Sequence, residues 1–254
     1  MPQTMPGPAN FRFYGSLNDF LPRSKKHSQI SYDFKNTPAV KDAIEAIGIP
    51  HPEIDVVLAN DVPVDFTYPL QPNDLIKVYP ATPECKCPSS YSLQANLPVT
   101  NNFVLDVHLG KLAKALRMLG FNTLYQNDYT DKTIATIAEQ ENRIVLTRDV
   151  GLLKHKAIKH GYWLRSQHLE EQLAEVISYF KLKKKSQPFT RCLECNNNIS
   201  VVAKEAVLDK LPPKTKQYFN EFYQCPTCSR VYWKGSHYDR MLQFVKRIEG
   251  SQER

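Results

Sequence analysis

Two Cys-x-x-Cys pairs constrain this chain more than any other feature of its 254 residues. They pair Cys192 with Cys195 and Cys225 with Cys228, and 29 residues separate the two pairs. A gap of two residues lets both sulfur atoms of one turn face a common ion, and two such turns complete a tetrahedral, closed zinc site. Free thiols, disulfides and a redox pair are the alternatives, although disulfides are rare in cytosolic proteins. The spacing therefore predicts a structural zinc ion.

The residues around these pairs indicate a zinc ribbon over residues 189–254. Short strand-like pieces, PFTRC and EFYQC, precede the two pairs, and SRVYW follows the second. The segment between the pairs is long for a ribbon, so we expect an inserted loop at KEAVLDKLPPKTKQYF. Cys85 and Cys87 form a C-x-C in a proline-rich stretch without a second pair nearby, and we interpret them as incidental thiols.

The charge of the chain is concentrated at this same end. The net charge is +7, and residues 183–254 hold 14 basic and 7 acidic side chains, whereas residues 1–100 hold 8 and 10. Such asymmetry favours an anionic partner for the basic end, with nucleic acid the commonest one. The alternative is a solvated basic surface that has no specific partner.

Composition excludes several classes of protein. A hydrophobic share of 42% with 12 Phe and 13 Tyr is too high for a disordered chain. No run of 18 apolar residues occurs, so we expect no transmembrane helix and no membrane partner. The first 30 residues show no secretory signal. We therefore expect a cytoplasmic protein.

Residues 10–80 are predicted to form a small β-grasp domain. Alternating apolar positions indicate the first two strands, and Gly48 is expected to end a helix that starts near Pro38. The order is strand, strand, helix, strand, strand, at residues 11–15, 30–34, 39–48, 54–60 and 75–80. Residues 81–100 lack periodicity and are predicted to be a linker.

Residues 101–182 alternate strand and helix patterns. Such alternation predicts a parallel sheet with helices on both faces, an α/β arrangement. The expected strands are residues 103–106, 121–126, 143–149 and 162–166. The expected helices are residues 109–120, 131–142 and 169–180, with part of 150–161. The charged stretch 181–188 is predicted to be a second linker.

Four aspartates follow the strands of this predicted sheet. Asp106 and Asp149 end two strands, Asp128 follows a third, and Asp131 opens a helix. Ligands bind beyond the carboxyl ends of parallel strands, where clustered carboxylates favour Mg²⁺ or Mn²⁺. Such ions activate water for phosphodiester hydrolysis. The alternative is that these aspartates are helix N-caps.

Three basic residues flank the same turns. Lys111, Arg117 and Arg148 are candidates for holding phosphate groups, and solvated helix faces are an equally good interpretation. No GxGxxG, P-loop or GxSxG motif occurs at these turns, which argues against a nucleotide cofactor and an α/β-hydrolase.

Taken in order, these segments resemble a known family. FVLDVHLGKLAKALRMLGFNTLY, DYTDKTIATIAEQENRIVLTRDVGLLK, RCLECN and CPTCSRVYWKGSHYDRM resemble the Mut-seven carboxy-terminal RNase family, a PIN-like nuclease fold followed by a zinc ribbon. The N-terminal segment resembles the ubiquitin-like domain that is fused ahead of it in many bacterial members. The resemblance covers about residues 10–245.

The resemblance implies an acidic site and a zinc site at the residues already singled out. The acidic residues are Asp106, Asp128, Asp131 and Asp149, and the zinc ligands are the four paired cysteines. The ubiquitin-like segment continues as VYPATPECK and lacks a free Gly-Gly end. We therefore expect it to dock a protein partner or to position RNA.

The leading hypothesis is a metal-dependent ribonuclease that uses Mg²⁺ or Mn²⁺, with zinc as a structural ion. The basic ribbon is expected to bind RNA through Tyr232, Trp233, Lys234 and Tyr238, with packing in the ribbon core as the alternative for the aromatic rings. The rival hypothesis is a non-catalytic adaptor that binds RNA or the ribosome.

Overall fold

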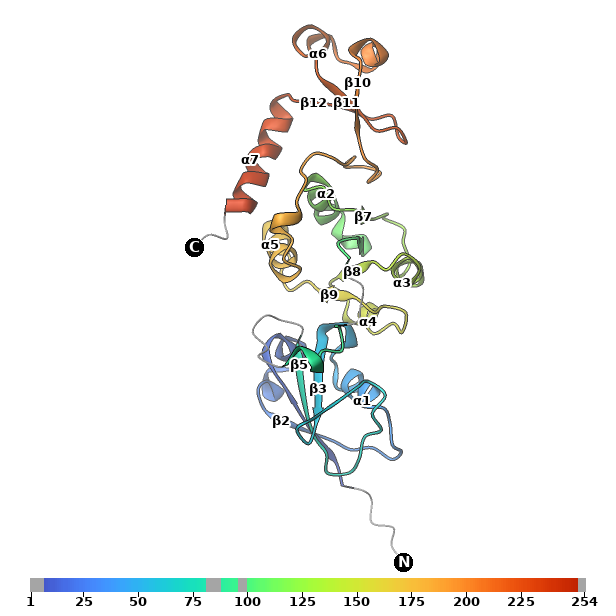
Figure 1. The fold of residues 1–254 in the computed structure, drawn as a ribbon, viewed down its shortest axis with the longest axis vertical. Helices are drawn as coiled ribbons and strands as arrows, with labels where there is room; N and C mark the ends of the chain where they lie inside the picture. Colours follow the sequence, from blue (N-terminus) through green and yellow to red (C-terminus); the bar gives the residue numbers. More distant parts are fainter. Residues whose placement is uncertain (1–6, 81–87, 96–99, 251–254) are drawn as a thin grey trace, which may run out of the picture. The chain divides into compact units, whose positions relative to one another are not determined.

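The computed structural model describes residues 7–80, 88–95 and 100–250, and Cys85 and Cys87 lie outside them (Figure 1). The chain forms two compact units. One contains the N-terminal segment with residues 138–142 and 147–163, and the other contains residues 100–137, 143–146 and 164–250. Within the described residues, every helix is too short or too polar to cross a membrane.

The N-terminal segment folds into a five-stranded mixed sheet. Its order is β2-β1-β5-β3-β4, with β1 parallel to β5 and the other neighbours antiparallel. The elements are β1 (Ala9–Phe13), the 3₁₀ turns Gly15–Phe20 and Arg23–Lys25, β2 (Gln29–Tyr32), α1 (Val40–Ile47), the 3₁₀ turn η3 (His51–Glu53), β3 (Ile54–Ala59), β4 (Val62–Val64) and β5 (Leu75–Pro80).

Helix α1 covers one face of this sheet because its apolar positions fall on one side. Val40, Ala43 and Ile44 are fully buried with the inward residues of β1, β3 and β5. Gly48 ends the helix with φ of 132°, a conformation that side chains with a Cβ rarely adopt, as the sequence predicts. The short strand β4 was not predicted, because Pro63 and the surrounding turn residues mask its pattern.

The described part of the predicted linker is bound to the N-terminal sheet. Residues 88–95 contain a 3₁₀ turn, Ser89–Tyr91. The amide of Leu93 donates to the carbonyl of Asp55, and the Gln94 side chain donates to the carbonyls of Pro52 and Ile54. Hydrogen bonds therefore hold these eight residues against the domain that precedes them.

The central segment forms a four-stranded sheet of order β7-β6-β8-β9. Its elements are β6 (Phe103–Leu105), the 3₁₀ turn η5 (Val107–Leu109), α2 (Gly110–Met118), β7 (Thr123–Leu124), α3 (Asp131–Gln140), β8 (Ile144–Thr147), α4 (Val150–Leu153), β9 (Gly161–Trp163) and α5 (Leu169–Tyr179). The predicted order of strands and helices is confirmed, although α4 is only four residues long.

Strands β6 and β8 are the centre of this sheet. They pair in parallel, with Leu105 beside Leu146, and every residue of both strands is buried. Burial of both faces explains why the two strands read as continuous apolar runs. The amide of Asp106 donates to the carbonyl of Leu146 at 3.1 Å, so the chain leaves both strands at the same edge of the sheet.

Helix α2 ends in a Schellman motif at Gly120. Gly120 has φ of 89°. The amide of Phe121 donates to the carbonyl of Leu116, and the amide of Gly120 donates to the backbone carbonyl of Arg117. A Cβ at Gly120 would lie 2.2 Å from the carbonyl oxygen of Gln187, so only glycine fits. The predicted second linker thus passes directly over the end of α2.

The C-terminal segment forms a three-stranded antiparallel ribbon of order β10-β11-β12. Its elements are the 3₁₀ turn Lys183–Lys185, β10 (Ser200–Val202), the 3₁₀ helix η7 (Lys204–Lys210), α6 (Pro213–Tyr218), β11 (Phe222–Gln224), β12 (Val231–Trp233) and α7 (Ser236–Gly250). The expected inserted loop is folded: Val207 and Leu211 pack against Phe222 to form the ribbon core.

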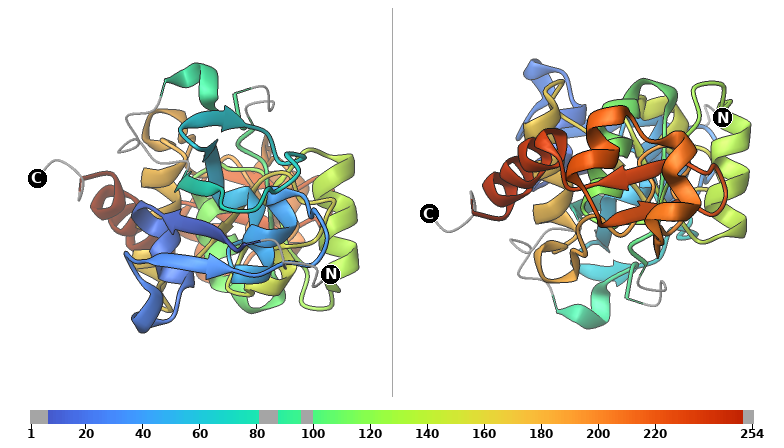
Figure 2. Two further views of the ribbon diagram at one scale, coloured as in Figure 1. Left: turned by 90° about the horizontal axis from the view of Figure 1, so that it is seen from below. Right: turned by 90° about the horizontal axis from the view of Figure 1, so that it is seen from above.

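Helix α7, which the sequence analysis did not predict, follows directly after β12 (Figure 2). Its signal is present in the sequence, because Tyr238, Met241, Leu242 and Val245 fall at helical spacing. Val245 is buried, and α7 packs beside α5.

In the first unit, the N-terminal domain holds the segment from α4 to β9. The carboxylate of Glu53, only 1% exposed, accepts a hydrogen bond from the amide of Trp163 at 2.6 Å. The Trp163 ring packs on Phe20 with centroids 4.9 Å apart. Lys154 donates to the carbonyl of Glu45 at 2.7 Å. Residues 147–163 thus fold against a domain that precedes them by about a hundred residues.

We predict that Glu53→Ala weakens this attachment. The substitution leaves the Trp163 amide without its acceptor, which costs about 1–3 kcal/mol for a buried group. Hydrogen exchange of the Trp163 amide should accelerate and the free energy of unfolding should fall. Glu53→Gln, which keeps an acceptor oxygen, should restore most of the protection. Asp33→Ala, at an exposed position, is the control and should change neither quantity. Unchanged exchange at Trp163 in Glu53→Ala would contradict the assignment.

Candidate functional site

The four paired cysteines form one compact group. Their sulfur atoms all lie within 4.8 Å of one another, with Cys192 3.5 Å from Cys228 and Cys195 3.3 Å from Cys225. A disulfide requires about 2.05 Å between sulfur atoms, so all four are free thiols. Tetrahedral zinc with Zn–S bonds of about 2.3 Å sets sulfur atoms roughly 3.8 Å apart. The predicted group is therefore assembled, and it can bind a zinc ion.

The backbone of each Cys-x-x-Cys turn has the same form. Residues Asn196 and Ser229, which directly follow the two pairs, have φ of 71° and 58°. Their amides donate to the carbonyls of Cys192 and Cys225, at 3.0 and 2.9 Å. The amide of Cys195 also points at the Cys192 sulfur, 3.5 Å away. Each turn thus curls its sulfur atoms toward one point.

Tyr232 supports the cysteine group from strand β12. Its hydroxyl accepts a hydrogen bond from the amide of Leu193 at 3.0 Å, which leaves its proton for the Cys192 sulfur, 3.1 Å away. Burial, followed by the hydrogen bond to Cys192, raises the pKa of Tyr232, so the hydroxyl is a proton donor at neutral pH. Such contacts orient a metal ligand. They argue against the expectation that Tyr232 stacks on RNA.

Arg117 joins helix α2 to the first cysteine turn. Its guanidinium donates to the carbonyls of Thr123, Leu193 and Glu194, at 2.9, 3.0 and 2.7 Å. Arg117 is only 3% exposed, and burial lowers its pKa, yet a guanidinium stays protonated at neutral pH. Because its donors point at backbone carbonyls inside the protein, the burial of Arg117 argues against the expected contact with RNA.

Two further side chains fix the same turn. Asn196 is 6% exposed, and its side chain accepts from the amide of Thr123 and donates to the Asn122 side chain. Arg191 donates to the carbonyls of Gly120 and Asn196, each at 2.9 Å. The first cysteine turn is therefore bound to the end of α2 by a network of hydrogen bonds that sequence reasoning did not foresee.

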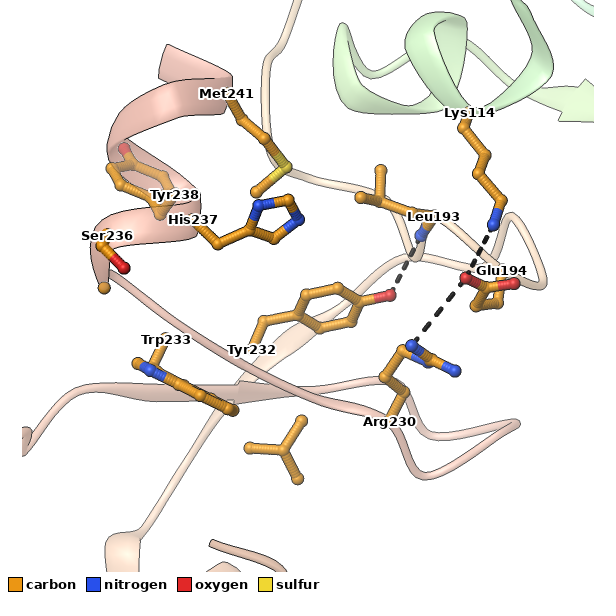
Figure 3. A pocket seen from close by; sticks show the side chains of 12 residues that line it. Lys114, Leu193, Glu194, Arg230, Tyr232, Trp233, Ser236, His237, Tyr238 and Met241 are labelled. Atoms are coloured by element: carbon orange, nitrogen blue, oxygen red, sulfur yellow. Dashed lines mark hydrogen bonds and ion pairs between the residues drawn. The ribbon is translucent and has the colours of Figure 1, made fainter. Parts of the chain in front are cut away.

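A pocket of about 370 Å³ lies beside the cysteine group, between β12 and the start of α7 (Figure 3). Glu194 stands between two cations, 3.1 Å from Lys114 and 3.8 Å from Arg230. The hydrogen bond from Lys114 and the positive charges around it lower the pKa of the Glu194 carboxyl. His237 also lines the pocket.

The other expected RNA contacts differ in their surroundings. Trp233 is partly buried and packs against the ribbon core, which is the alternative that the sequence analysis gave for the aromatic rings. Lys234 is exposed, but its ammonium group is 2.9 Å from the Glu221 carboxylate, and this hydrogen bond raises the pKa of Lys234. Lys111 and Arg148 are exposed. Tyr238 packs on Phe189, with ring centroids 4.7 Å apart.

Asp106 and Asp149 both have capping hydrogen bonds. Asp106 follows β6, is 8% exposed, and accepts from the amide of Val107 at 2.6 Å. Asp149 follows β8, is exposed, and accepts from the amide of Gly151 at 2.7 Å at the start of α4. Both aspartates therefore have the helix-capping role that the sequence analysis left open as the alternative.

Asp128 and Asp131 lie at the start of α3. Both are exposed. Asp131 is the first residue of the helix. The hydroxyl of Thr130 accepts a hydrogen bond from the amide of Thr133 at 3.2 Å. The capping hydrogen bond here therefore comes from Thr130, and Asp131 places a negative charge in the first turn.

The four carboxylates do not form a closed group of ligands like the cysteines. Across the described residues, the cysteine group is the only set of three or more His, Cys, Asp or Glu side chains with ligand atoms within 4.8 Å of one another. Mg²⁺ commonly binds one or two carboxylates and keeps several water molecules.

Comparison with known families assigns the chain. No curated protein and no solved structure matched it. The family model described as Mut7-C ubiquitin matches residues 7–86, and the one described as Mut7-C RNAse domain matches residues 101–245. The second match covers more than half of the chain and includes the sheet, the cysteine group and most of α7. The chain thus belongs to the Mut7-C RNAse family and carries a Mut7-C ubiquitin domain ahead of the RNAse domain.

Proposed function

We propose that this protein is a metal-dependent ribonuclease that hydrolyses phosphodiester bonds at the edge of the sheet formed by β6 and β8. The observation that carries the proposal is the parallel pairing of these strands, because Asp106 follows one directly and Asp149 follows the other after Arg148. Open α/β sheets bind ligands beyond the carboxyl ends of their strands. The ribonuclease-type description of the family supports the same assignment.

Asp106 and Asp149 would hold Mg²⁺ or Mn²⁺, and Asp128 and Asp131 would add negative charge around it. Carboxylate oxygens suit these hard cations. When bound, such an ion supplies Lewis acidity toward the scissile phosphate. The capping hydrogen bonds fix the two aspartates before any ion arrives, which reduces the entropy lost on binding. Arg148 and Lys111, both exposed, would attract the phosphates of RNA.

The second candidate function is a non-catalytic RNA- or ribosome-binding adaptor. The capping hydrogen bonds of Asp106 and Asp149 favour it, because they give both residues a structural role that needs no metal. In either case, the ubiquitin-like domain is the part that we predict to dock a protein partner.

The two functions predict different results for Asp149. Asparagine caps helices as well as aspartate does, but it lacks the negative charge that a cation needs. Asp149→Asn should therefore abolish Mg²⁺- or Mn²⁺-dependent cleavage of mixed RNA at an unchanged Tm. Asp149→Ala should lose cleavage and also about 0.5–2 kcal/mol of unfolding free energy, because the cap is gone.

Asp209→Asn, at an exposed position on η7, is the matched control and should cleave like wild type. Wild-type cleavage by Asp149→Asn would favour the adaptor. Absence of cleavage by the wild-type protein on any RNA with either ion would do the same.

We also propose that the cysteine group holds one structural zinc ion. Metal analysis of the purified protein should give about one zinc per chain. Cys225→Ser should lose the ion and render the ribbon sensitive to protease, while the N-terminal β-grasp domain stays resistant. Cys87→Ser should keep its zinc, because we interpret that thiol as incidental. A metal-free protein with a protease-resistant ribbon would contradict this proposal.

A further inference from the structure

An open groove of about 460 Å³ lies between helices α2 and α7. We call it the α2–α7 groove and define it by the lining residues that matter here: Lys111, Lys114 and Met118 from α2, and Arg240, Met241 and Phe244 from α7. Leu169 of α5 also lines it. None of the four aspartates lines the groove.

Both walls of the groove follow helical periodicity. Lys111, Lys114 and Met118 are three and four residues apart along α2, and so fall on one face. Arg240 and Phe244 are four residues apart along α7. From Lys111 to Met118 the helix rises about 10 Å. Each helix therefore presents both cations and apolar side chains to the groove.

The groove has an excess of positive charge. All its charged lining side chains are basic. Lys114 is paired with Glu194 at 3.1 Å, and Arg247 at the far end is paired with Glu170 at 3.3 Å. Within the described residues, Lys111 and Arg240 form no ion pair. These two cations, one on each wall, are the ones available to an anionic ligand.

We propose that the α2–α7 groove binds single-stranded RNA and guides it to the acidic site, an inference that rests on the ribonuclease function proposed above. Lys111 and Arg240 contact the phosphates. Bases pack on the thioethers of Met118 and Met241 and on Phe244, whose ring already has the Arg247 guanidinium 5.9 Å from its centroid. A basic groove with an aromatic platform is the usual arrangement for single-stranded nucleic acid.

The chemistry of the groove favours this ligand over other anions. An A-form duplex keeps its bases stacked inside, so it cannot use the apolar floor. An acidic peptide would use the cations, but its backbone does not present a flat ring at every unit as a nucleic acid does.

The position of the groove also suits a path to the acidic site. Helix α2 begins at Gly110, four residues after Asp106, and Lys111 lies in its first turn. A strand that follows the α2 stripe from Met118 to Lys111 therefore ends five residues from Asp106, a rise of about 9 Å through the 3₁₀ turn and the start of α2.

Binding of a fluorescein-labelled oligouridine to the full chain, in buffer without added Mg²⁺ or Mn²⁺, tests the electrostatic part. Lys111→Gln/Arg240→Gln should bind at least about tenfold more weakly at low salt. The slope of log affinity against log salt should fall by about 1.4, since each phosphate contact on a single strand contributes about 0.7. Lys210→Gln/Lys216→Gln removes two exposed lysines outside the groove and should stay within about twofold of wild type.

Phe244→Leu tests the stacking part, because leucine keeps the apolar volume but loses the ring. It should weaken oligouridine binding by about tenfold. A circular dichroism melt of each variant checks that the fold is intact. Wild-type affinity in Phe244→Leu would overturn the assignment to single-stranded RNA, even if the double glutamine variant binds weakly.

Failure of this proposal can be told apart from failure of the ribonuclease function. If the wild-type chain cleaves RNA and Lys111→Gln/Arg240→Gln binds and cleaves it equally well, only the groove assignment is overturned. If the wild-type chain neither binds nor cleaves RNA, the proposed function itself fails. A wild-type dimer that becomes a monomer in the double variant, measured by light scattering, would assign the groove to a second copy of the chain and overturn the proposal.

Discussion

The hydrogen bonds of one buried guanidinium join helix α2, strand β7 and the first cysteine turn. Arg117 leaves helix α2 and ends on the carbonyls of β7 and of the first cysteine turn. A buried charge is tolerated only where its donors are satisfied, so α2, β7 and the turn must keep one arrangement for Arg117 to be stable. The cysteine group and the α2–α7 groove both depend on that arrangement. The fact that one family model spans residues 101–245 agrees with this continuity.

Local patterns in the sequence were sufficient to predict most of the architecture. The alternation of strands and helices, the stop at Gly48 and the spacing of the four cysteines each depend on neighbouring residues, and the structure confirms all three. Strand β4 was missed because a proline-rich turn surrounds it. Helix α7 was not predicted, although its apolar residues fall at helical spacing.

Side-chain roles were harder to predict, because they depend on what lies opposite each residue. Arg117 is next to the apolar stripe of α2, where periodicity alone cannot distinguish a buried cation from a solvated one. Tyr232 was expected on an RNA surface, and its contact with a cysteine sulfur is a role that the sequence did not suggest. The aspartates were predicted at strand ends, and they do follow β6, β7 and β8. The capping hydrogen bonds of Asp106 and Asp149 do not distinguish a capping role from a catalytic one.

The attachment of Trp163 to Glu53 and Phe20 has a consequence for cooperativity. Segments that exchange and unfold together are set by contacts and not by the order of the sequence. Because residues 147–163 pack on the N-terminal domain, the unit that opens as one body crosses the boundary between the two family matches. A fragment that begins at residue 100 would lack the contacts of Trp163 with Glu53 and Phe20. The ubiquitin-like domain therefore supplies contacts that part of the domain following it would otherwise lack.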